Sequence, residues 1–476
     1  MSDKVLPYRE IVQSHGGSTM VLGDIFERFA RQSPVTVMAR AALEHALAPE
    51  AIDALFERTA QRQYTRTLLF SSVVDLMAAV VAKIQPAVNA AYRARAETLG
   101  VSLKAVYDKL DRTETGVSAE LVRHTARTLD PVITAMGGGR AAWLPGYSIK
   151  ILDGNHLAGT QHRLKELRTT GAGALPGKAL VVLDPQAMLV TDVFCCEDGH
   201  AQERSLLEAV LEQIRAGEVW IADRNFCTTG FLFGISDRRG SFVIRQHGAT
   251  LHIEWAGERR PCGRVETGAV FEQEMRLGDG DGRTMLVRRI TVELDQPTRD
   301  GEAEIHILTN LPAEVADSRM IAELYRRRWT VEAAFGELAT CLKGEIDTLG
   351  YPKAALFAFC VALVSYNVMS VVKAALRSVH GEEPVEELSF YYLAGEVAGT
   401  HRGMMIAIPE DEWAVFHGLA AEGFGRVLRD LAAGVRLSVY RKQIRGPKRP
   451  PTKRDSGAKV KHVSTAKLLG KRRGST

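Results

Sequence analysis

The sequence predicts an α/β protein in which a sheet-forming segment lies between two helical regions. From the N-terminus to about residue 125, apolar side chains recur at helical spacing. After the linker Met136-Gly-Gly-Gly139, short apolar strands alternate with short helices, and helical spacing returns from about residue 385 to 440. We therefore expect a helical N-terminal region, a central α/β domain and a helical C-terminal region, with boundaries near 1–135, 145–380 and 381–440.

Composition is that of an ordinary soluble protein, with 46% apolar and 25% charged residues over 476 positions. The start, MSDKVLPYRE, has no apolar leader. The longest apolar run, Ala354 to Val372, contains Ser365, Tyr366, Asn367 and Ser370, so a buried core helix is a better interpretation than a membrane span. The six cysteines form no CxxC pair, which favours reduced thiols. We expect a cytoplasmic protein that does not contact a membrane.

Positive charge is concentrated at the C-terminus. From Arg441 onward there are thirteen Lys or Arg residues and one acid, Asp455, so this segment has a net charge of +12. Because the whole chain has a net charge of +4, the remainder has a net charge of −8. We expect residues 441–476 to form a basic disordered tail. Such a tail either attracts a polyanion, for which nucleic acid is the natural candidate, or only keeps the protein soluble.

A stretch in the N-terminal region has the spacing of a helix–turn–helix. In "AETLGVSLKAVYDKLDR", one helix ends at Gly100, Ser102 can cap the next helix, and Val106 and Leu110 face inward. Two readings remain open, a DNA-reading motif and an ordinary helical hairpin. In the first reading, the residues free to face DNA are Lys104, Tyr107, Lys109 and Arg112.

The central segment predicts a recognisable order of elements. Three strands, a helix, a strand, a helix and a further strand are followed by a β-rich stretch over about 246–303 and then by a final helix. This order is typical of a ribonuclease-H-like domain with a β-rich insertion before its final helix. The elements are a strand ending at Asp153, two strands joined at Asp184-Pro185-Gln186, a helix from about His200 to Arg215, a strand ending at Asp223, a helix over Thr229 to Asp237, a strand over Ser241 to Arg245, and a helix that begins at Asp317 or Ser318.

Two aspartates follow strands that lie side by side in this topology. Asp153 and Asp223 would project into one crevice, and the final helix can deliver a third carboxylate. Three converging carboxylates cannot all stay ionised without a compensating charge. Hard divalent cations supply that charge, and two Mg²⁺ ions about 3.5–4 Å apart are suited to phosphoryl displacement.

Glu332 is the candidate for the third carboxylate. Counted at 100° per residue on one continuous helix, Glu332 lies at the border of the apolar stripe, with Tyr325, Arg328 and Lys343 close to it in angle. That position suits a ligand that reaches into a crevice, and the basic line beside it suits a phosphate backbone. The alternative is a plain surface salt bridge between Arg328 and Glu332, which are four residues apart.

Three motif blocks resemble those of the DDE transposases of the IS-four family, which are bacterial insertion-sequence enzymes. The blocks are "LDGNHL", "IADRNF" and "YRRRWTVEAAF", and the resemblance covers about residues 145–375. The third block in that family reads Y-x2-R-x3-E-x6-K, and Tyr325, Arg328 and Glu332 match its first three positions. Its lysine position holds Ala339 here, so Lys343 is the candidate substitute.

The resemblance implies cut-and-paste DNA transposition with Mg²⁺, or Mn²⁺ in its place, by a homodimer that pairs the terminal inverted repeats and joins them to target DNA. It implies that Asp153, Asp223 and Glu332 are the catalytic metal ligands, and that Tyr325 and Arg328 hold phosphates. It also suggests that Trp255 in the insertion stacks on an extruded base, although a core position is the alternative. Cleavage would pass through a hairpin intermediate, as in relatives, in an enzyme that works at the bacterial nucleoid.

Other polar residues have two readings each. Arg224 and Asn225 follow Asp223 and either hold a phosphate or position the strand end. His156 either touches substrate or is structural, and His200 and Glu203 are read as residues of a helix start. Two other functions remain as alternatives, a ribonuclease-H-like nuclease without strand transfer and a catalytically silent DNA-binding protein.

Overall fold

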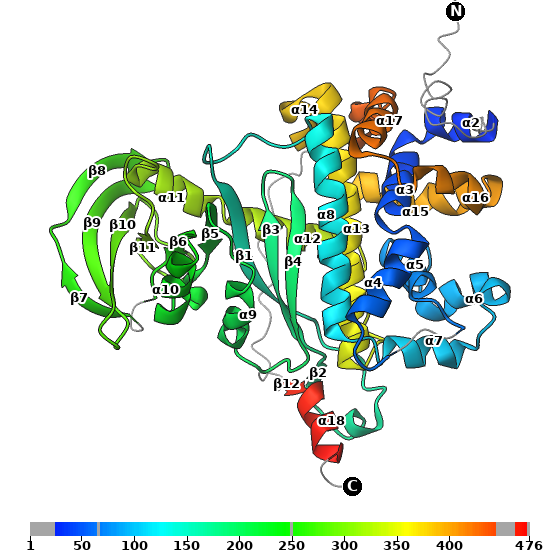
Figure 1. Ribbon diagram of the computed structural model, residues 1–476, viewed down its shortest axis with the longest axis horizontal. Coiled ribbons are helices and arrows are strands. Elements are labelled where there is room, and N and C mark those ends of the chain that lie inside the picture. Colours follow the sequence, from blue (N-terminus) through cyan, green and yellow to red (C-terminus); the bar gives the residue numbers. More distant parts are fainter. Residues whose placement is uncertain (1–23, 64–66, 248–250, 444–461, 474–476) are drawn as a thin grey trace, which may run out of the picture.

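The computed structural model describes four stretches of the chain, and its elements are shown in Figure 1. They are residues 24–63, 67–247, 251–443 and 462–473.

The N-terminal region is helical wherever the structure describes it, as the apolar spacing predicts. Its last and longest helix, α8, packs along α13 and against β4, so it belongs to the wall of the sheet domain (Figure 1). The helices are α2 (Asp24–Gln32), α3 (Pro34–Ala46), α4 (Pro49–Thr59), α5 (Phe70–Val81), α6 (Val88–Leu99), α7 (Leu103–Leu110) and α8 (Thr115–Met136).

Helices α6 and α7 form the expected hairpin. Gly100 ends α6 in the left-handed conformation, with φ of 60°, and the Ser102 side chain accepts a hydrogen bond from the Ala105 N–H. The expectation that Lys109 is free to face DNA is wrong, because its ammonium lies 3.8 Å from the centroid of the Phe56 ring. Lys104 is exposed but paired with Asp108 at 2.6 Å.

A mixed sheet forms the centre of the molecule, in the order β4-β3-β1-β5-β6-β11-β10-β9-β7, with β8 paired to β9. β3 runs antiparallel to β1 and β4, whereas β5 runs parallel to β1 and β6. The first five strands in this order are β1 (Ser148–His156), β3 (Lys178–Asp184), β4 (Leu189–Cys196), β5 (Glu218–Ala222) and β6 (Ser241–Arg245).

The β-rich stretch continues the same sheet beyond β6, and it curves away as the left arm in Figure 1. The stretch is β-rich, as predicted, and its strands pair antiparallel. They are β7 (His252–Ala256), β8 (Arg260–Val265), β9 (Gly268–Gly278), β10 (Thr284–Leu294) and β11 (Glu304–Thr309).

Helices cover both faces of the central strands, so alternate side chains enter two different cores. Ile151 and Ile221 enter the larger core, which also contains α8, α12 (Trp329–Cys341) and α13 (Pro352–His380). Their neighbours Leu152 and Ala222 enter a smaller core with α9 and α10. α10 (Thr229–Asp237) has the predicted bounds. The expected helix from His200 to Arg215 is wrong, because the structure has only a 3₁₀ turn, η3 (Glu203–Leu206), and the short α9 (Leu207–Leu211).

α13 (Pro352–His380) is the central helix of the larger core. By length and composition it could cross a membrane, but all of its most apolar window is buried inside the protein. Its polar residues have partners here, since Asn367 bonds both the N–H and the carbonyl of Val190 at 2.7 and 2.9 Å. The interpretation as a buried core helix is therefore confirmed. All six cysteines are free thiols.

The C-terminal region is helical, as predicted, and of the expected tail only residues 441–443 and 462–473 lie within the described residues. The helices are α14 (Glu382–Glu386), α15 (Phe390–Ala407), α16 (Glu410–Trp413) and α17 (Ala421–Ala433). Within the tail, β12 (His462–Ser464) pairs parallel with β2 (Gly173–Leu175), and α18 (Thr465–Arg473) follows it. The expectation of a wholly disordered tail is thus wrong for residues 462–473, because Leu468 and Leu469 find an apolar partner surface.

Candidate active site at the ends of the central strands

Asp153 and Asp223 are neighbours where the parallel pairing of β1 and β5 ends. The last residues in register are Leu152 and Ala222, so each aspartate is the next residue along its chain. Both follow the side-chain alternation of Ile151 and Ile221, which places them on the face covered by α12 (Trp329–Cys341). The expected end of the first strand at Asp153 is wrong, because β1 continues to His156 on hydrogen bonds to β3.

The stretch "LYRRRWTVEAAFGELATCLKG" forms two helices. α11 (Ser318–Arg326) begins at Asp317, which caps it, and α12 begins at Trp329. Between them the Arg328 N–H bonds the Tyr325 carbonyl at 2.9 Å and the Thr330 N–H bonds the Arg327 carbonyl at 3.0 Å, which is the i to i−3 pattern of a 3₁₀ turn. The angular placement of residues along one continuous helix is therefore wrong across this break.

Arg328 joins the carboxylates of the two elements. Its Nη1 donates to Asp153 Oδ2 at 2.9 Å and its Nη2 to Glu332 Oε1 at 2.6 Å. The arginine is only 7% exposed, so the contact is more than a surface salt bridge between residues of one helix turn. Its Nε is buried and has no hydrogen-bond partner among the described residues. Arg328 thus supplies the positive charge that the clustered carboxylates need.

The pKa of Asp153 is shifted by burial and by the charges of its neighbours in the cluster. Burial raises the pKa of Asp153 to about 6, and the charges of Asp223 and Glu332 add to that shift. The Arg328 guanidinium and the Gly154 N–H act in the opposite direction. Burial also raises the pKa of Tyr325, against the charge of Arg328. Tyr325 is buried beside the cluster, at 8% exposure.

Glu203 lies against this cluster, although its sequence position indicates only a helix start. Glu203 Oε2 accepts a hydrogen bond from Asn225 Nδ2 at 2.5 Å, and the Asn225 N–H donates to Asp223 Oδ1 at 2.8 Å. A Cβ on Gly154 would lie 2.3 Å from Glu203 Oε1, so any larger residue there would displace the Glu203 carboxylate. The signal available in the sequence was the DGN triplet, whose glycine follows Asp153 directly.

Asn225, Arg224 and His156 have partners within the protein. Asn225 holds the turn after β5 through Asp223 and Glu203, while Arg224 Nη1 lies 2.8 Å from Glu302 and is half exposed. His156 lies 3.1 Å from the buried Lys178 ammonium. Burial and the charge of Lys178 lower the pKa of His156. Lys178 has no counterpart among the sequence predictions.

Two predicted DNA contacts lie outside the cluster. Lys343 follows the end of α12, and its Nζ donates to the Pro86 carbonyl at 2.8 Å. Its expected place in line with Glu332 is therefore wrong, because the helix ends before it. Trp255 is on β7 and 47% exposed, which excludes the core position. A second tryptophan, Trp329, is 61% exposed and lies 5.3 Å from the Arg328 guanidinium.

The donor set of the cluster suits a hard divalent cation, since it consists of carboxylate oxygens. The side chains are not gathered around one point, and the described residues contain no group of three or more His, Cys, Asp or Glu side chains that could hold a metal ion. The reason is that the Arg328 guanidinium lies between Asp153 and Glu332.

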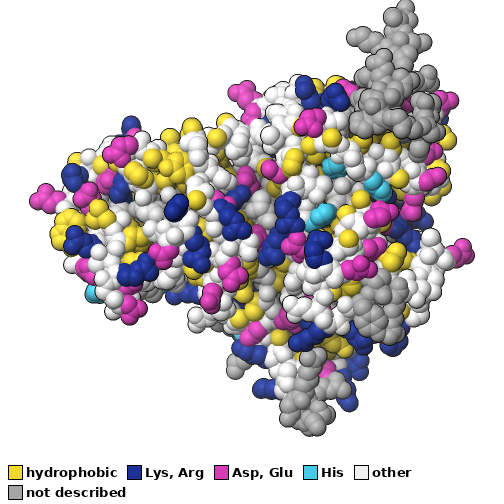
Figure 2. Space-filling view, viewed as in Figure 1, with side chains coloured by type: hydrophobic (Ala, Val, Ile, Leu, Met, Phe, Trp, Pro, Cys, Tyr) yellow, Lys and Arg dark blue, Asp and Glu magenta, His cyan; other side chains and the backbone are white. Residues whose placement is uncertain are grey.

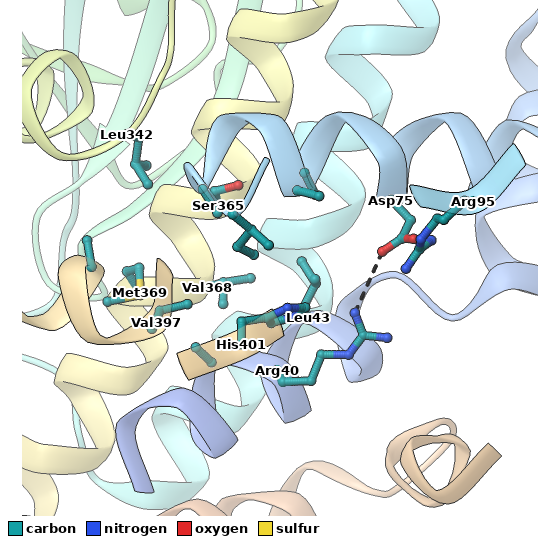
Figure 3. Close-up of a pocket in the computed structure, with 16 residues that line it drawn as sticks. Arg40, Leu43, Asp75, Arg95, Leu342, Ser365, Val368, Met369, Val397 and His401 are labelled. Carbon is teal, nitrogen blue, oxygen red and sulfur yellow. Dashed lines mark ion pairs between the residues drawn. The ribbon is translucent and has the colours of Figure 1, made fainter. Parts of the chain in front are cut away.

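Another charged cavity lies between α3, α5, α13 and α15, away from the sheet (Figure 3). Arg40 pairs with Glu44 and lies 3.6 Å from Asp75, and Arg95 pairs with Asp75. Burial, with the charges of Arg40 and Arg95, lowers the pKa of His401 to about 3. Each of these carboxylates contacts an arginine within the protein, and the ion pairs hold the helices together.

Residues 144–368 match the family model described as the transposase DDE domain. The matched segment contains β1, β5, the β-rich strands and α12, and with them Asp153, Asp223 and Glu332. The match supports a DDE transposase, an enzyme that acts on DNA. Enzymes of this class generally use divalent metals.

No curated protein matches the chain. Among solved structures, it is similar to one described as the cryo-EM structure of the piggyBac transposase synaptic complex with hairpin DNA. The sequence identity is 11% and the TM-score 0.39, over 90% of this chain and 89% of that chain. At that score the likeness carries no argument about fold or function.

Proposed function

We propose that the protein is a cut-and-paste DNA transposase of the IS-four family, with a ribonuclease-H-like core that carries the β-rich strands as an insertion. The observation that carries the proposal is the pairing of Arg328 with Asp153 on β1 and with Glu332 on α12, at the edge of the sheet where Asp223 follows β5. The strand order β4-β3-β1-β5-β6 supports the core assignment, with its antiparallel and parallel pairs as that fold requires. The transposase family match supports the reaction class.

Asp153, Asp223 and Glu332 would hold Mg²⁺, with Mn²⁺ as a substitute. When bound, the two ions would stabilise charge on the attacking and leaving oxygens of an in-line displacement at phosphorus. Arg328 would then exchange a carboxylate for a DNA phosphate, to which a guanidinium offers two parallel donors. Asn225 and Glu203 would keep Asp223 oriented, since the Asn225 N–H donates to Asp223 Oδ1 and Glu203 accepts a hydrogen bond from the Asn225 side chain.

The substrates would be the terminal inverted repeats of an insertion sequence and a target DNA, paired by a homodimer in the bacterial cytoplasm. Cleavage would pass through a hairpin at the end of the element before strand transfer. Trp255 and Trp329 are both exposed and offer flat surfaces on which a displaced base could stack.

Incubating the protein with the DNA ends that flank its coding region, in Mg²⁺ or in EDTA, tests the proposal directly. We expect nicked, hairpin and joined products on a denaturing gel, all of them dependent on the metal. Nicked product alone would indicate a nuclease without strand transfer. Binding without any cleavage would indicate a catalytically silent DNA-binding protein and would refute the proposal.

A further inference from the structure

The loop between β1 and β3 has a small apolar core of its own. Leu164, Leu167 and Ala174 are buried together and form a cluster apart from the two cores of the sheet. The partly buried side chains that pack on this cluster are Leu468 and Leu469 of α18. A loop from the middle of the chain thus depends on the far C-terminal segment to cover its apolar side chains.

Two further contacts fix α18 on this loop. β12 pairs with β2 in parallel register, with Val463 opposite Ala174. Lys467 Nζ lies 2.9 Å from Asp198 Oδ2, just beyond β4. Burial would raise the pKa of Asp198, but hydrogen bonds, including one from Lys467, outweigh that effect and lower the pKa to about 2. Asp198 therefore stays ionised and paired at any ordinary pH.

Docking α18 brings basic side chains together on one surface. Lys467 and Lys471 of α18 are exposed, and so are three basic residues of the loop beside η2 (Lys165–Leu167). We call these five residues the basic platform, and they are Arg163, Lys165, Arg168, Lys467 and Lys471. Figure 2 shows Lys and Arg side chains around the end of the molecule where α18 lies in Figure 1.

The basic platform is connected to the acidic cluster through short lengths of chain. Its loop begins directly after β1, which carries Asp153. The Gln161 N–H donates to the Asp347 carbonyl at 2.8 Å, and Asp347 follows α12, which carries Glu332. The platform therefore keeps a fixed position relative to both elements of the candidate active site.

We propose that the basic platform binds the phosphate backbone of double-stranded DNA beside the acidic cluster, and that the docked α18 is one half of it. A tail that served only for solubility would need no apolar dock, whereas this chain uses Leu468 and Leu469 to hold lysines in place. This inference rests on the proposed function, because the DNA it would hold is the substrate of the neighbouring site. It assigns to residues 462–473 a fixed position in place of a free polyanion-binding arm.

Duplex binding of the full-length chain in EDTA tests the platform without any cleavage. The neutralising variants are Lys467→Gln with Lys471→Gln, and Arg163→Gln with Lys165→Gln and Arg168→Gln. The undocking variant, Leu468→Ser with Leu469→Ser, keeps every charge. Arg426→Gln with Arg429→Gln, on exposed residues of α17, is the charge-matched control. Affinity for a labelled duplex of arbitrary sequence is measured by anisotropy between about 50 and 200 mM salt.

We expect the double lysine variant to reduce the slope of log affinity against log salt by about 2, because each phosphate contact contributes roughly 0.9. The triple loop variant should reduce it by about 3. The undocking variant should have the same slope as the double lysine variant. The α17 control should change the slope by less than about 0.5, which is about half of one phosphate contact. Hydrogen exchange at residues 462–473 verifies that the undocking variant is folded elsewhere and released there.

An undocking variant with the parental slope would overturn the proposal, because the lysines would then act from a free arm. Parental slopes in both neutralising variants would overturn it too. If the parent cleaves DNA ends while these variants bind like the parent, only the platform fails. If the parent binds no duplex, the proposed function itself fails.

Discussion

Among the clusters of described residues that bury arginine beside carboxylates, the one around Arg40 and the one around Arg328 differ in how completely the carboxylates are paired. Around Arg40 and Arg95, each of Glu44, Asp75 and Glu410 meets a guanidinium. At the sheet edge, Arg328 is shared by Asp153 and Glu332, and among the described residues Asp223 has backbone and not arginine contacts.

The difference separates a structural ion-pair network from a candidate site. A network that only joins helices gains no stability from a buried charge without an oppositely charged partner, since each unpaired buried charge costs several kcal/mol. At the sheet edge, three carboxylates lie near a single arginine that pairs with only two of them, so they retain negative charge that a cation or a water-filled crevice must balance. A carboxylate without an arginine partner among the described residues, more than the presence of buried ions, therefore marks the functional cluster.

The largest expected effect is on catalysis. Asp153→Asn, Asp223→Asn and Glu332→Gln should each lower metal-dependent cleavage of end DNA by at least about a hundredfold, since each removes a charged oxygen at the reacting centre. Binding of the same DNA should persist, which an electrophoretic mobility assay measures. Asp75→Asn, in the matched cluster, is the control and should leave cleavage within about twofold. Full cleavage by any of the three site variants would remove that residue from the assignment.

The next effect is on stability. Arg328→Ala and Arg40→Ala should each lower the free energy of unfolding by about 3 kcal/mol, because each leaves buried carboxylates without their partner. Mg²⁺ should restore part of the loss in Arg328→Ala by taking the place of the guanidinium, and none of it in Arg40→Ala. Thermal unfolding with and without Mg²⁺ measures both. Equal responses of the two variants to Mg²⁺ would contradict the distinction between the clusters.

The two clusters should also respond to pH with opposite signs. The pKa of His401 is lowered to about 3, so the unfolded chain binds its proton more readily and this residue makes stability fall as pH drops below about 6.5. The pKa of Asp153 is raised to about 6, so the folded protein binds that proton more readily and stability falls as pH rises from about 4 to 6.

Melting curves between about pH 4.5 and 7 check these signs with His401→Asn and Asp153→Asn. At the acid end, the stability of His401→Asn should fall less than that of the parent protein. Asp153→Asn should gain stability over the parent at the neutral end. A shift of the same sign in both variants would mean that burial does not control these two groups.

The smallest effect is expected at Lys343, whose ammonium bonds the Pro86 carbonyl away from the acidic cluster. Lys343→Ala should change the cleavage rate by no more than about twofold, the size typical of a surface substitution. A loss of tenfold or more would indicate that Lys343 moves to the DNA when the complex forms.

The sequence predicts helices and strands well where apolar residues repeat at one regular spacing. It predicts them poorly where contacts with distant residues determine the structure. The strands that precede Asp153 and Asp223 are apolar runs bounded by turn residues, so both aspartates could be placed beforehand. Glu332 could be selected because it lies in a motif block. The break between α11 and α12 at Arg327 and Arg328 could not be predicted, since the residues there have ordinary helix propensity.

Glu203 and the C-terminal strand β12 could not be placed from the sequence, because residues distant in the chain determine their positions. Glu203 reaches the cluster only because Asn225 and Gly154, far away in sequence, leave it a place. β12 has three residues, too few for any alternation to be visible, and it is a strand only because β2 is beside it. Long-range partners of this kind leave no signature in the neighbouring residues.

The parallel pairing of β12 with β2 also has a consequence for how the molecule is made. β2 and its apolar loop leave the ribosome well before the segment that covers them, because that segment lies far downstream in the sequence. The sheet and its acidic edge can therefore form on a nascent chain before the loop is covered. A chain interrupted before residue 462 would expose Leu164 and Leu167, so quality control could distinguish unfinished copies by this one uncovered patch.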